Sequence, residues 1–210
     1  MGKYTAIDDP SAFFQTALYT GNGGTLAVTN DGNSDLQPDW VWTKKRSDTS
    51  HHALVDSSRG ATKQIYTNLT AAEETVSGVT AFNTDGFTLG SNGTANLNGA
   101  TFVGWQWKCN GGSTSTNTDG SINTTVQSNS TAGFNIITYT GTGGGETLGH
   151  NLGVAPDMWI IKRRSGTGSW AVGFNDSSIL GGTSNYLILQ SEGATSTYNN
   201  FWGSSPANSN

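Results

Sequence analysis

Cysteine is nearly absent from this sequence, because Cys109 is the only one among 210 residues. A single thiol excludes an intrachain disulfide framework, so stability has to come from strand pairing, packing and self-association. Charged residues make up only 12% of the chain, and the formal net charge of −5 gives no general attraction to nucleic acid.

Long apolar runs are also absent. No stretch approaches the roughly 20 apolar residues that a membrane span needs. The N-terminal residues carry no apolar signal region. We therefore expect a protein that is made in a cytosol, stays soluble and does not insert into a membrane.

The residue patterns that support catalysis are sparse. His51, His52 and His150 do not have the spacing of metal ligands, and Cys109 precedes a glycine-rich stretch with no base near it in sequence. There is neither a Gly-x-Ser-x-Gly elbow nor a Walker loop. We predict a non-enzymatic protein with no catalytic residues and no cofactor, apart from the calcium considered below.

Glycine and aromatic residues are abundant instead: 29 Gly, seven Trp, six Tyr and eight Phe. Glycine-rich turns between short aromatic and β-branched runs are typical of antiparallel β-sheets. The runs that we interpret as strands are 13–19, 25–28, 40–45, 52–56, 64–68, 82–90, 102–108, 158–161, 170–174 and 186–190. A stretch at 70–75 fits either a short helix or a loop.

One order of features occurs twice: a phenylalanine, a Tyr-Thr-Gly turn, Pro-Asp, an apolar strand and a basic end. The two copies are Phe14, 19–23 and 38–47, and Phe134, 139–143 and 156–165. We therefore predict an all-β fold of two tandem antiparallel β-sandwich domains, jelly-roll or lectin-like. The expected boundaries are 1–112 for the first, 113–131 for a Gly/Ser/Thr/Asn-rich linker, and 132–210 for the second.

The second copy has no counterpart of the strand at 102–108. Either the chain stops within a repeat, or another segment or subunit supplies the closing strand. A missing strand leaves an open sheet edge, which a β protein must pair or protect.

A polar loop in the first copy has oxygen-bearing side chains at alternate positions. Calcium takes six to eight oxygen ligands, and Asp31, Asn33, Asp35 and Asp39 would supply four. Only Asp157 keeps its carboxylate in the second copy. A polar turn built on side-chain hydrogen bonds is the alternative interpretation.

Tryptophans and basic strand ends are the remaining candidates for binding. The tryptophans are Trp40, Trp42, Trp105, Trp107, Trp159, Trp170 and Trp202. They fit either a sugar-stacking surface or the core of a sandwich. The basic ends at 44–46 and 162–164 fit either contacts with anionic glycan or solvated strand ends.

Taken together, these segments resemble repeat-containing structural proteins of marine tailed bacteriophages, which are tail fibre or virion proteins. The segments that carry the resemblance are 7–11, 14–23, 31–47, 56–63, 85–90, 102–108, 134–143 and 152–165. The resemblance implies a virion protein that forms a homo-oligomer, contacts other virion proteins and attaches to host cell-surface glycan. A capsid decoration or head-fibre protein and a carbohydrate-binding module are the alternatives.

Overall fold

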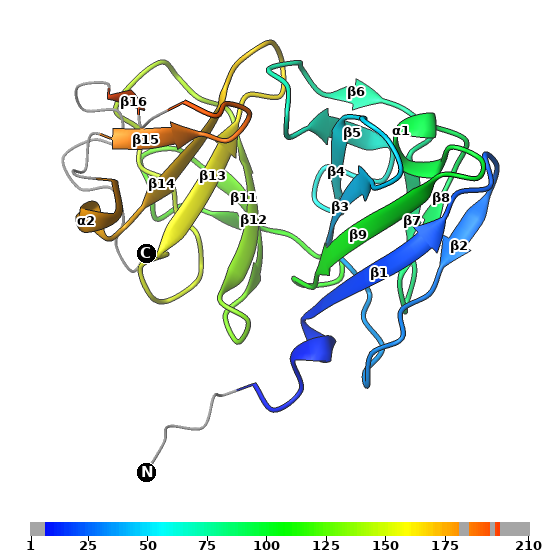
Figure 1. Ribbon diagram of the computed structural model, residues 1–210. Helices are drawn as coiled ribbons and strands as arrows, with labels where there is room; N and C mark the ends of the chain where they lie inside the picture. The colour runs from blue at the N-terminus through cyan, green and yellow to red at the C-terminus, as the bar shows by residue number, and fades with distance from the viewer. Residues whose placement is uncertain (1–6, 181–184, 194–195, 198–210) are drawn as a thin grey trace.

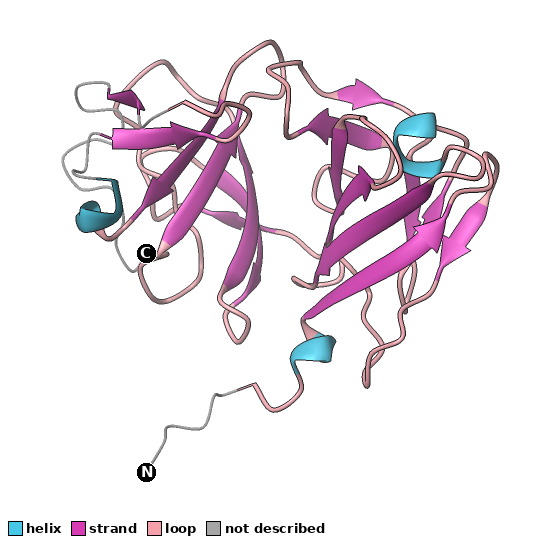
Figure 2. Ribbon diagram, in the orientation of Figure 1, coloured by secondary structure: helices cyan, strands magenta, loops and turns pink. Residues whose placement is uncertain are grey.

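The computed structural model describes residues 7–180, 185–193 and 196–197. The fold is all-β, with 40% strand and 5% helix, which confirms the predicted fold class at that level (Figure 2). In the described residues, the helical elements are the 3-10 turn Pro10–Ala12 and the short helices α1 and α2. No helix in these ranges is long and apolar enough to cross a membrane.

The first half of the chain forms two antiparallel sheets that stack as a β-sandwich (Figure 1). The large sheet has the order β1-β9-β3-β4-β5-β6 and the small sheet has the order β2-β8-β7. The elements are β1 (Phe14–Thr20), β2 (Leu26–Val28), β3 (Trp40–Lys45), β4 (His52–Asp56), β5 (Lys63–Tyr66), β6 (Glu74–Thr75), β7 (Val79–Phe82), β8 (Phe87–Leu89), α1 (Gly93–Asn96) and β9 (Thr101–Trp107).

Residue alternation decides which side chains enter the space between these two sheets. Val41 and Val55 point inward from the large sheet, and Phe87 and Leu89 meet them from the small one. All four are at most 1% exposed, so their burial is a main source of stability for this half.

The turn before β8 depends on a glycine. Gly86 has φ +97°, and a Cβ there would lie 2.0 Å from the carbonyl oxygen of Val28. Only glycine fits both conditions, so Asp-Gly forms the turn between β7 and β8, and the expected strand at 82–90 is a turn followed by a short strand.

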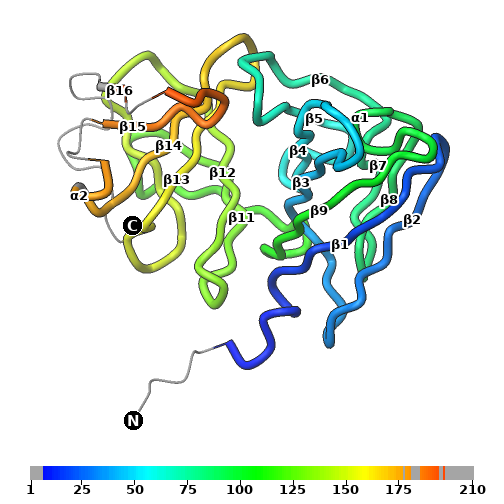
Figure 3. The backbone as a smooth tube through the Cα atoms, viewed as in Figure 1, coloured from blue at the N-terminus to red at the C-terminus, as the bar shows by residue number. Residues whose placement is uncertain are grey.

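The second half of the chain forms a three-stranded sheet, β10-β11-β12, and a four-stranded sheet, β13-β14-β15-β16. Figure 3 traces the chain from β9 into these strands. The elements are β10 (Ser115–Asn117), β11 (Thr124–Asn129), β12 (Phe134–Tyr139), β13 (Met158–Lys162), β14 (Trp170–Phe174), α2 (Ser177–Leu180), β15 (Asn185–Ile188) and β16 (Ser196–Thr197).

The β3–β4 hairpin and the β13–β14 hairpin have the same register. Trp40 pairs with Asp56 in the first, and Met158 pairs with Phe174 in the second. The hydrogen bond that follows each hairpin is also repeated: Ser57 N donates to Asp39 O at 2.8 Å, and Asn175 N donates to Asp157 O at 2.9 Å. The repeated sequence therefore folds into the same local structure twice.

Two expectations need correction. The segment 113–131 is not a linker, because it contains β10 and β11, and β11 pairs with β12 along six residues. The helical alternative for 70–75 is wrong as well, since this stretch is a loop that ends in the short strand β6. Trp202 and the polar C-terminal residues lie outside the described residues.

Candidate functional site: an aromatic face between the two halves

Cross-strand pairing gathers aromatic side chains on one face of the large sheet. Phe14 of β1 and Trp40 of β3 both pair with Trp107 of β9, which lies between them. In the next row on the same face, Trp42 pairs with Trp105. We call these five residues the aromatic face.

This face is opposite the sandwich core, because alternate residues of a strand point to opposite sides of the sheet. On the core side of β3, Val41 and Thr43 are at most 1% exposed. Trp40 and Trp42, which alternate with them along the strand, are only partly buried. The tryptophans of β3 and β9 therefore lie outside the core between the two sheets of the first half. Trp40 and Trp42 pack instead against a second core cluster, that of Leu54, Ile65 and Trp170.

The rings of the aromatic face contact one another and the second half of the chain. The centroids of Phe14 and Trp107 are 4.7 Å apart, within the usual range for aromatic pairs. The ring centroid of Phe134 on β12 lies 6.0 Å from that of Trp40 and 6.4 Å from that of Trp107. Ile160 of β13 packs into the same apolar cluster as Trp40. The second half thus covers part of the aromatic face.

A groove of about 360 Å³ remains where this cover ends. Its aromatic lining is Phe13, Phe14, Trp107 and Phe134, and Lys108 lines it as well. Phe14 is 38% exposed, so its ring is accessible from solvent. An apolar groove with accessible ring faces and one cationic side chain suits a ligand with flat apolar faces and polar or anionic edges, such as a sugar.

The first polar junction between the halves is centred on Asp39. Its carboxylate is completely buried and accepts four hydrogen bonds. The donors are Ser57 Oγ at 2.6 Å and the backbone N–H groups of Cys109 at 2.6 Å, Gly111 at 2.9 Å and Gly112 at 2.8 Å. The backbone at 109–112, just after β9, therefore turns around the carboxylate of Asp39.

Gln127 of β11 completes this junction. It is fully buried, and its side-chain oxygen accepts from the backbone N–H groups of Asn110 and Gly112, each at 2.9 Å. Its side-chain NH₂ donates to Ser57 Oγ at 2.9 Å and Ser58 Oγ at 2.8 Å. All four hydrogen-bonding positions of the amide are therefore used.

The second polar junction lies at the other side of the aromatic face. Trp170 of β14 is 2% exposed, and its indole N–H donates to the carbonyl oxygens of Tyr66 at 2.9 Å and Leu69 at 3.2 Å. Nearby, Glu73 accepts from Arg59 at 2.9 Å and from Arg164 Nε at 2.9 Å. Carboxylate, guanidinium and indole groups thus hold the strands of the two halves together.

Sequence comparison places this architecture in one family. A family model described as "Domain of unknown function (DUF7483)" matches residues 9–210. The chain belongs to this family. The match spans both halves, so the DUF7483 domain includes the aromatic face and both junctions. Searches of curated proteins and of solved structures gave no match.

The four residues of the predicted calcium loop have different surroundings in the DUF7483 domain. Asp31, Asn33 and Asp35 are exposed, whereas Asp39 is buried with its four donors. Among the described residues, no three His, Cys, Asp or Glu side chains form a group that could hold a metal ion.

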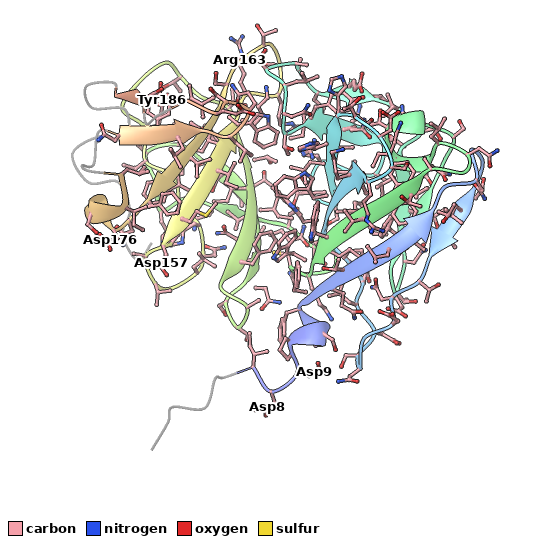
Figure 4. All side chains as sticks on the ribbon, viewed as in Figure 1. Asp8, Asp9, Asp157, Arg163, Asp176 and Tyr186 are labelled. Carbon is pink, nitrogen blue, oxygen red and sulfur yellow. The ribbon has the colours of Figure 1, made fainter. Side chains whose placement is uncertain are left out.

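The polar-turn interpretation of this loop agrees with its hydrogen bonds. Gly32 N donates to Gln15 Oε1 at 3.0 Å, and Ser34 Oγ donates to Asp9 at 2.5 Å. Figure 4 labels Asp9, which lies beside the first helical turn. Calcium binding by Asp31, Asn33 and Asp35 stays a prediction from the sequence.

The two basic strand ends have different roles. Lys45 is 8% exposed and lies 3.6 Å from Asp48, within its own half. Lys162 donates to Thr70 O at 3.3 Å, and Arg164 bonds to Glu73, so both contact the other half. The second basic end therefore contributes to the junction rather than to a solvated strand end alone.

The sequence singled out Asp39, Trp170 and the basic end at 162–164, but not as parts of a junction. Gln127 falls in the predicted linker, and no sequence pattern indicates that Arg59 and Glu73 pair. One signal was available: Asp-Ser-Ser occurs at 56–58 and again at 176–178, and all three residues of the first copy contact these groups. The repeat identified a turn but not its partners.

Glu73 makes the second junction sensitive to acid. Burial alone would raise its pKa, but hydrogen bonds from Arg164 and Arg59 outweigh burial and lower the pKa below its usual value. A lowered carboxyl pKa gives stability that is present above the unfolded value of about 4.3 and is lost as pH falls through the folded pKa. We expect the melting temperature of the chain to exceed that of Glu73→Gln at pH 6, and the gap to narrow as the pH falls below about 4.3. A gap that stays constant would contradict the role of this carboxylate.

Cys109 is expected to be chemically inert in the folded chain. Burial, and then the negative charge of Asp39, raise the pKa of its thiol to about 12. Its Sγ donates to Gln127 O at 3.0 Å, and the side chain is 3% exposed. A thiol-reactive dye should therefore react about a hundredfold more slowly with the native chain than with the urea-unfolded chain. Equal rates would mean that the first junction opens readily.

Proposed function

We propose that this chain is a non-enzymatic structural protein of a tailed-bacteriophage virion, in a tail fibre or tail appendage that attaches to the host surface. The observation that carries the proposal is the groove lined by Phe14, Trp107 and Phe134, in which the 38% exposed side chain of Phe14 is accessible to a sugar. The resemblance of the repeated segments to phage tail fibre and virion proteins supports the same assignment.

The finer architecture belongs to this proposal. We interpret the two halves as tandem β-sandwich domains of the jelly-roll or lectin-like type, related by duplication. The repeated hairpin register and the repeated hydrogen bonds of Asp39 O and Asp157 O support that interpretation. In a fibre, such domains would contact further copies of the chain and other virion proteins.

Sugar recognition in the groove follows from ring geometry. The apolar C–H face of a pyranose packs against an aromatic ring, while its hydroxyl groups stay directed towards water and polar side chains. Phe14 and Trp107 are inclined by 53°, so they present two faces at an angle. Lys108 lies beside them and would favour an anionic sugar over a neutral one.

Removing one ring tests this function. We expect the chain to bind a subset of anionic sugars on a glycan array. Phe14→Ala should weaken that binding about two- to tenfold, since an aromatic contact contributes roughly 0.5–1.5 kcal/mol. Leu18→Ala is the matched control, because Leu18 lies on the same strand and face and is 64% exposed. No binding to any glycan, or equal loss in both variants, would refute the role of the groove in attachment.

A further inference from the structure

The two edge strands of the large sheet differ in length and charge (Figure 1). β6 has only two residues, both exposed, and one of them is Glu74. β1 has seven residues without a charge or a proline, and its register with β9 contains no bulge. Shortness, charges, prolines and bulges are the features by which β proteins keep an edge from pairing with another strand. β6 is protected in this way, whereas β1 is not.

Main-chain bonds identify the residues of β1 that are directed to its open edge. Gly21 N donates to Ala100 O at 2.8 Å, and Lys108 N donates to Phe13 O at 2.9 Å. Bonded and non-bonded pairs alternate along an antiparallel ladder, so the odd-numbered residues of β1 bond to β9. Within the described residues, no strand is bonded to β1 at its other edge. The main-chain groups directed there are those of Phe14, Thr16, Leu18 and Thr20.

The side chains of these four residues are accessible as well. All four are exposed, and the exposed fractions of Phe14 and Leu18 are 38% and 64%. They lie on the outer face of the sheet, because Ala17 between them points into the core. β1 thus combines unpaired main-chain groups with two exposed apolar side chains on one uncharged strand.

The main chain of a second copy of β1 is complementary to this edge. The second copy is placed antiparallel, with its Ala17 opposite Ala17 of the first. Phe14 of each copy is then opposite Thr20 of the other, and only even-numbered residues meet as bonded pairs. Thr16 of each copy is likewise opposite Leu18 of the other. Four such pairs with two bonds each use every open N–H and C=O group of both strands.

The side chains of two copies are complementary in the same register. Leu18 of the second copy lies diagonal to both Phe14 and Leu18 of the first, and diagonal neighbours on one face are within reach of long side chains. The exposed apolar side chains of the two copies would therefore form one line across the contact. Each chain has a net charge of −5, but β1 itself carries no charge, so no like charges meet within the paired strands.

We propose that two copies of this chain pair through the open edges of β1 about a two-fold axis. The large sheets of the two copies join into one continuous sheet, in which Thr16 of each copy pairs with Leu18 of the other. A symmetric contact of this kind closes on itself, so it gives a dimer rather than a filament. The pairing goes beyond the proposed function, because it requires neither a glycan nor a virus particle.

Two cysteine variants of the full chain test this register. Thr16→Cys and Leu18→Cys are mixed under mild oxidation, and the products are identified by mass. Bonded pairs have Cα atoms about 5.5 Å apart, which a disulfide can bridge. The mixture should therefore yield at least about tenfold more linked dimer than either variant alone, because residues diagonal to each other are roughly 7–8 Å apart. Cys109 does not interfere, because it is only 3% exposed.

A third cysteine variant controls for random collision between copies. Val154 is 64% exposed, like Leu18, but lies in the second half of the chain. Val154→Cys mixed with Thr16→Cys should give no more dimer than Thr16→Cys alone. A yield from Thr16→Cys with Leu18→Cys that is no higher than this control would overturn the proposal. So would a higher yield from Leu18→Cys alone than from its mixture with Thr16→Cys, which would mean another register or another surface.

Sedimentation equilibrium tests the unmodified chain without any cysteine variant. The average mass should rise from 22.0 kDa towards twice that value as the protein concentration increases. Leu18→Lys should stay at 22.0 kDa, because it places two like charges diagonally across the contact. The side chain of Leu18 is largely exposed, so this variant should keep the melting temperature of the unmodified chain. An unmodified chain that stays monomeric, or a Leu18→Lys variant that associates equally well, would contradict pairing through β1.

Discussion

Replacing Asp39 by alanine is expected to lower the free energy of unfolding by about 3–5 kcal/mol. The change removes the shared acceptor of the buried N–H of Cys109, of the backbone N–H groups of Gly111 and Gly112 and of the Ser57 hydroxyl, although Gly112 N keeps its bond to Gln127 Oε1. Each unsatisfied buried donor costs roughly 1–3 kcal/mol, although relaxation and water entry recover part of that sum. Urea unfolding followed by tryptophan fluorescence measures the effect.

The repeat supplies a matched control for this variant. Asp157 occupies the same place in the second copy but is exposed (Figure 4), and the bond from Asn175 N to its main-chain oxygen does not involve its side chain. Asp157→Ala should therefore change the free energy of unfolding by no more than about 0.5 kcal/mol. Similar losses in the two variants would show that Asp39 does not organise the junction as described.

Replacing Trp170 by alanine is expected to destabilise the chain by about 3–5 kcal/mol. Trp170 fills the contact between β14 and the first half, in one apolar cluster with Leu54 and Ile65. Its loss would leave a cavity and free two carbonyl groups, those of Tyr66 and Leu69, from their donor. It should also increase solvent access to Trp40 and Trp42, which a red shift of tryptophan fluorescence would report.

Trp170→Phe separates packing from hydrogen bonding. Phenylalanine keeps most of the apolar volume but cannot donate to the two carbonyl groups, so the expected loss is about 1–2 kcal/mol. If Trp170→Phe lowers the free energy of unfolding as much as Trp170→Ala does, the stabilisation comes mainly from the hydrogen bonds of the indole N–H. An alanine variant with the stability of the unmodified chain would mean that the halves do not pack through Trp170.

The sequence predicted the strands where local chemistry alone determines them. The expected strands at 40–45, 52–56 and 170–174 are confirmed as β3, β4 and β14 to the residue. In β3, Pro-Asp sets the start and the two-residue alternation sets the faces, both of which are short-range effects. The boundaries of β5 and β15 differ by one to two residues, because each strand ends where its pairing with its neighbours ends, which is a long-range effect.

What covers each face could not be predicted in the same way. Alternation places Trp40 and Trp42 on one face of β3, but it does not say that the second half of the chain lies over that face. The bonds of Gln127 to Ser57 and Ser58 span about seventy positions, and no local pattern announces them. The polar composition of 113–131 indicated a linker for the same reason: its partners are distant in sequence.

The most direct test of the proposed function is the position of the chain on an intact phage particle. Gold-labelled antibodies against the DUF7483 domain, imaged on purified particles by electron microscopy, should decorate tail fibres or another tail appendage. Labelling distributed over the head would contradict the tail assignment and favour capsid decoration. Absence of the chain from purified particles would contradict its role as a virion protein.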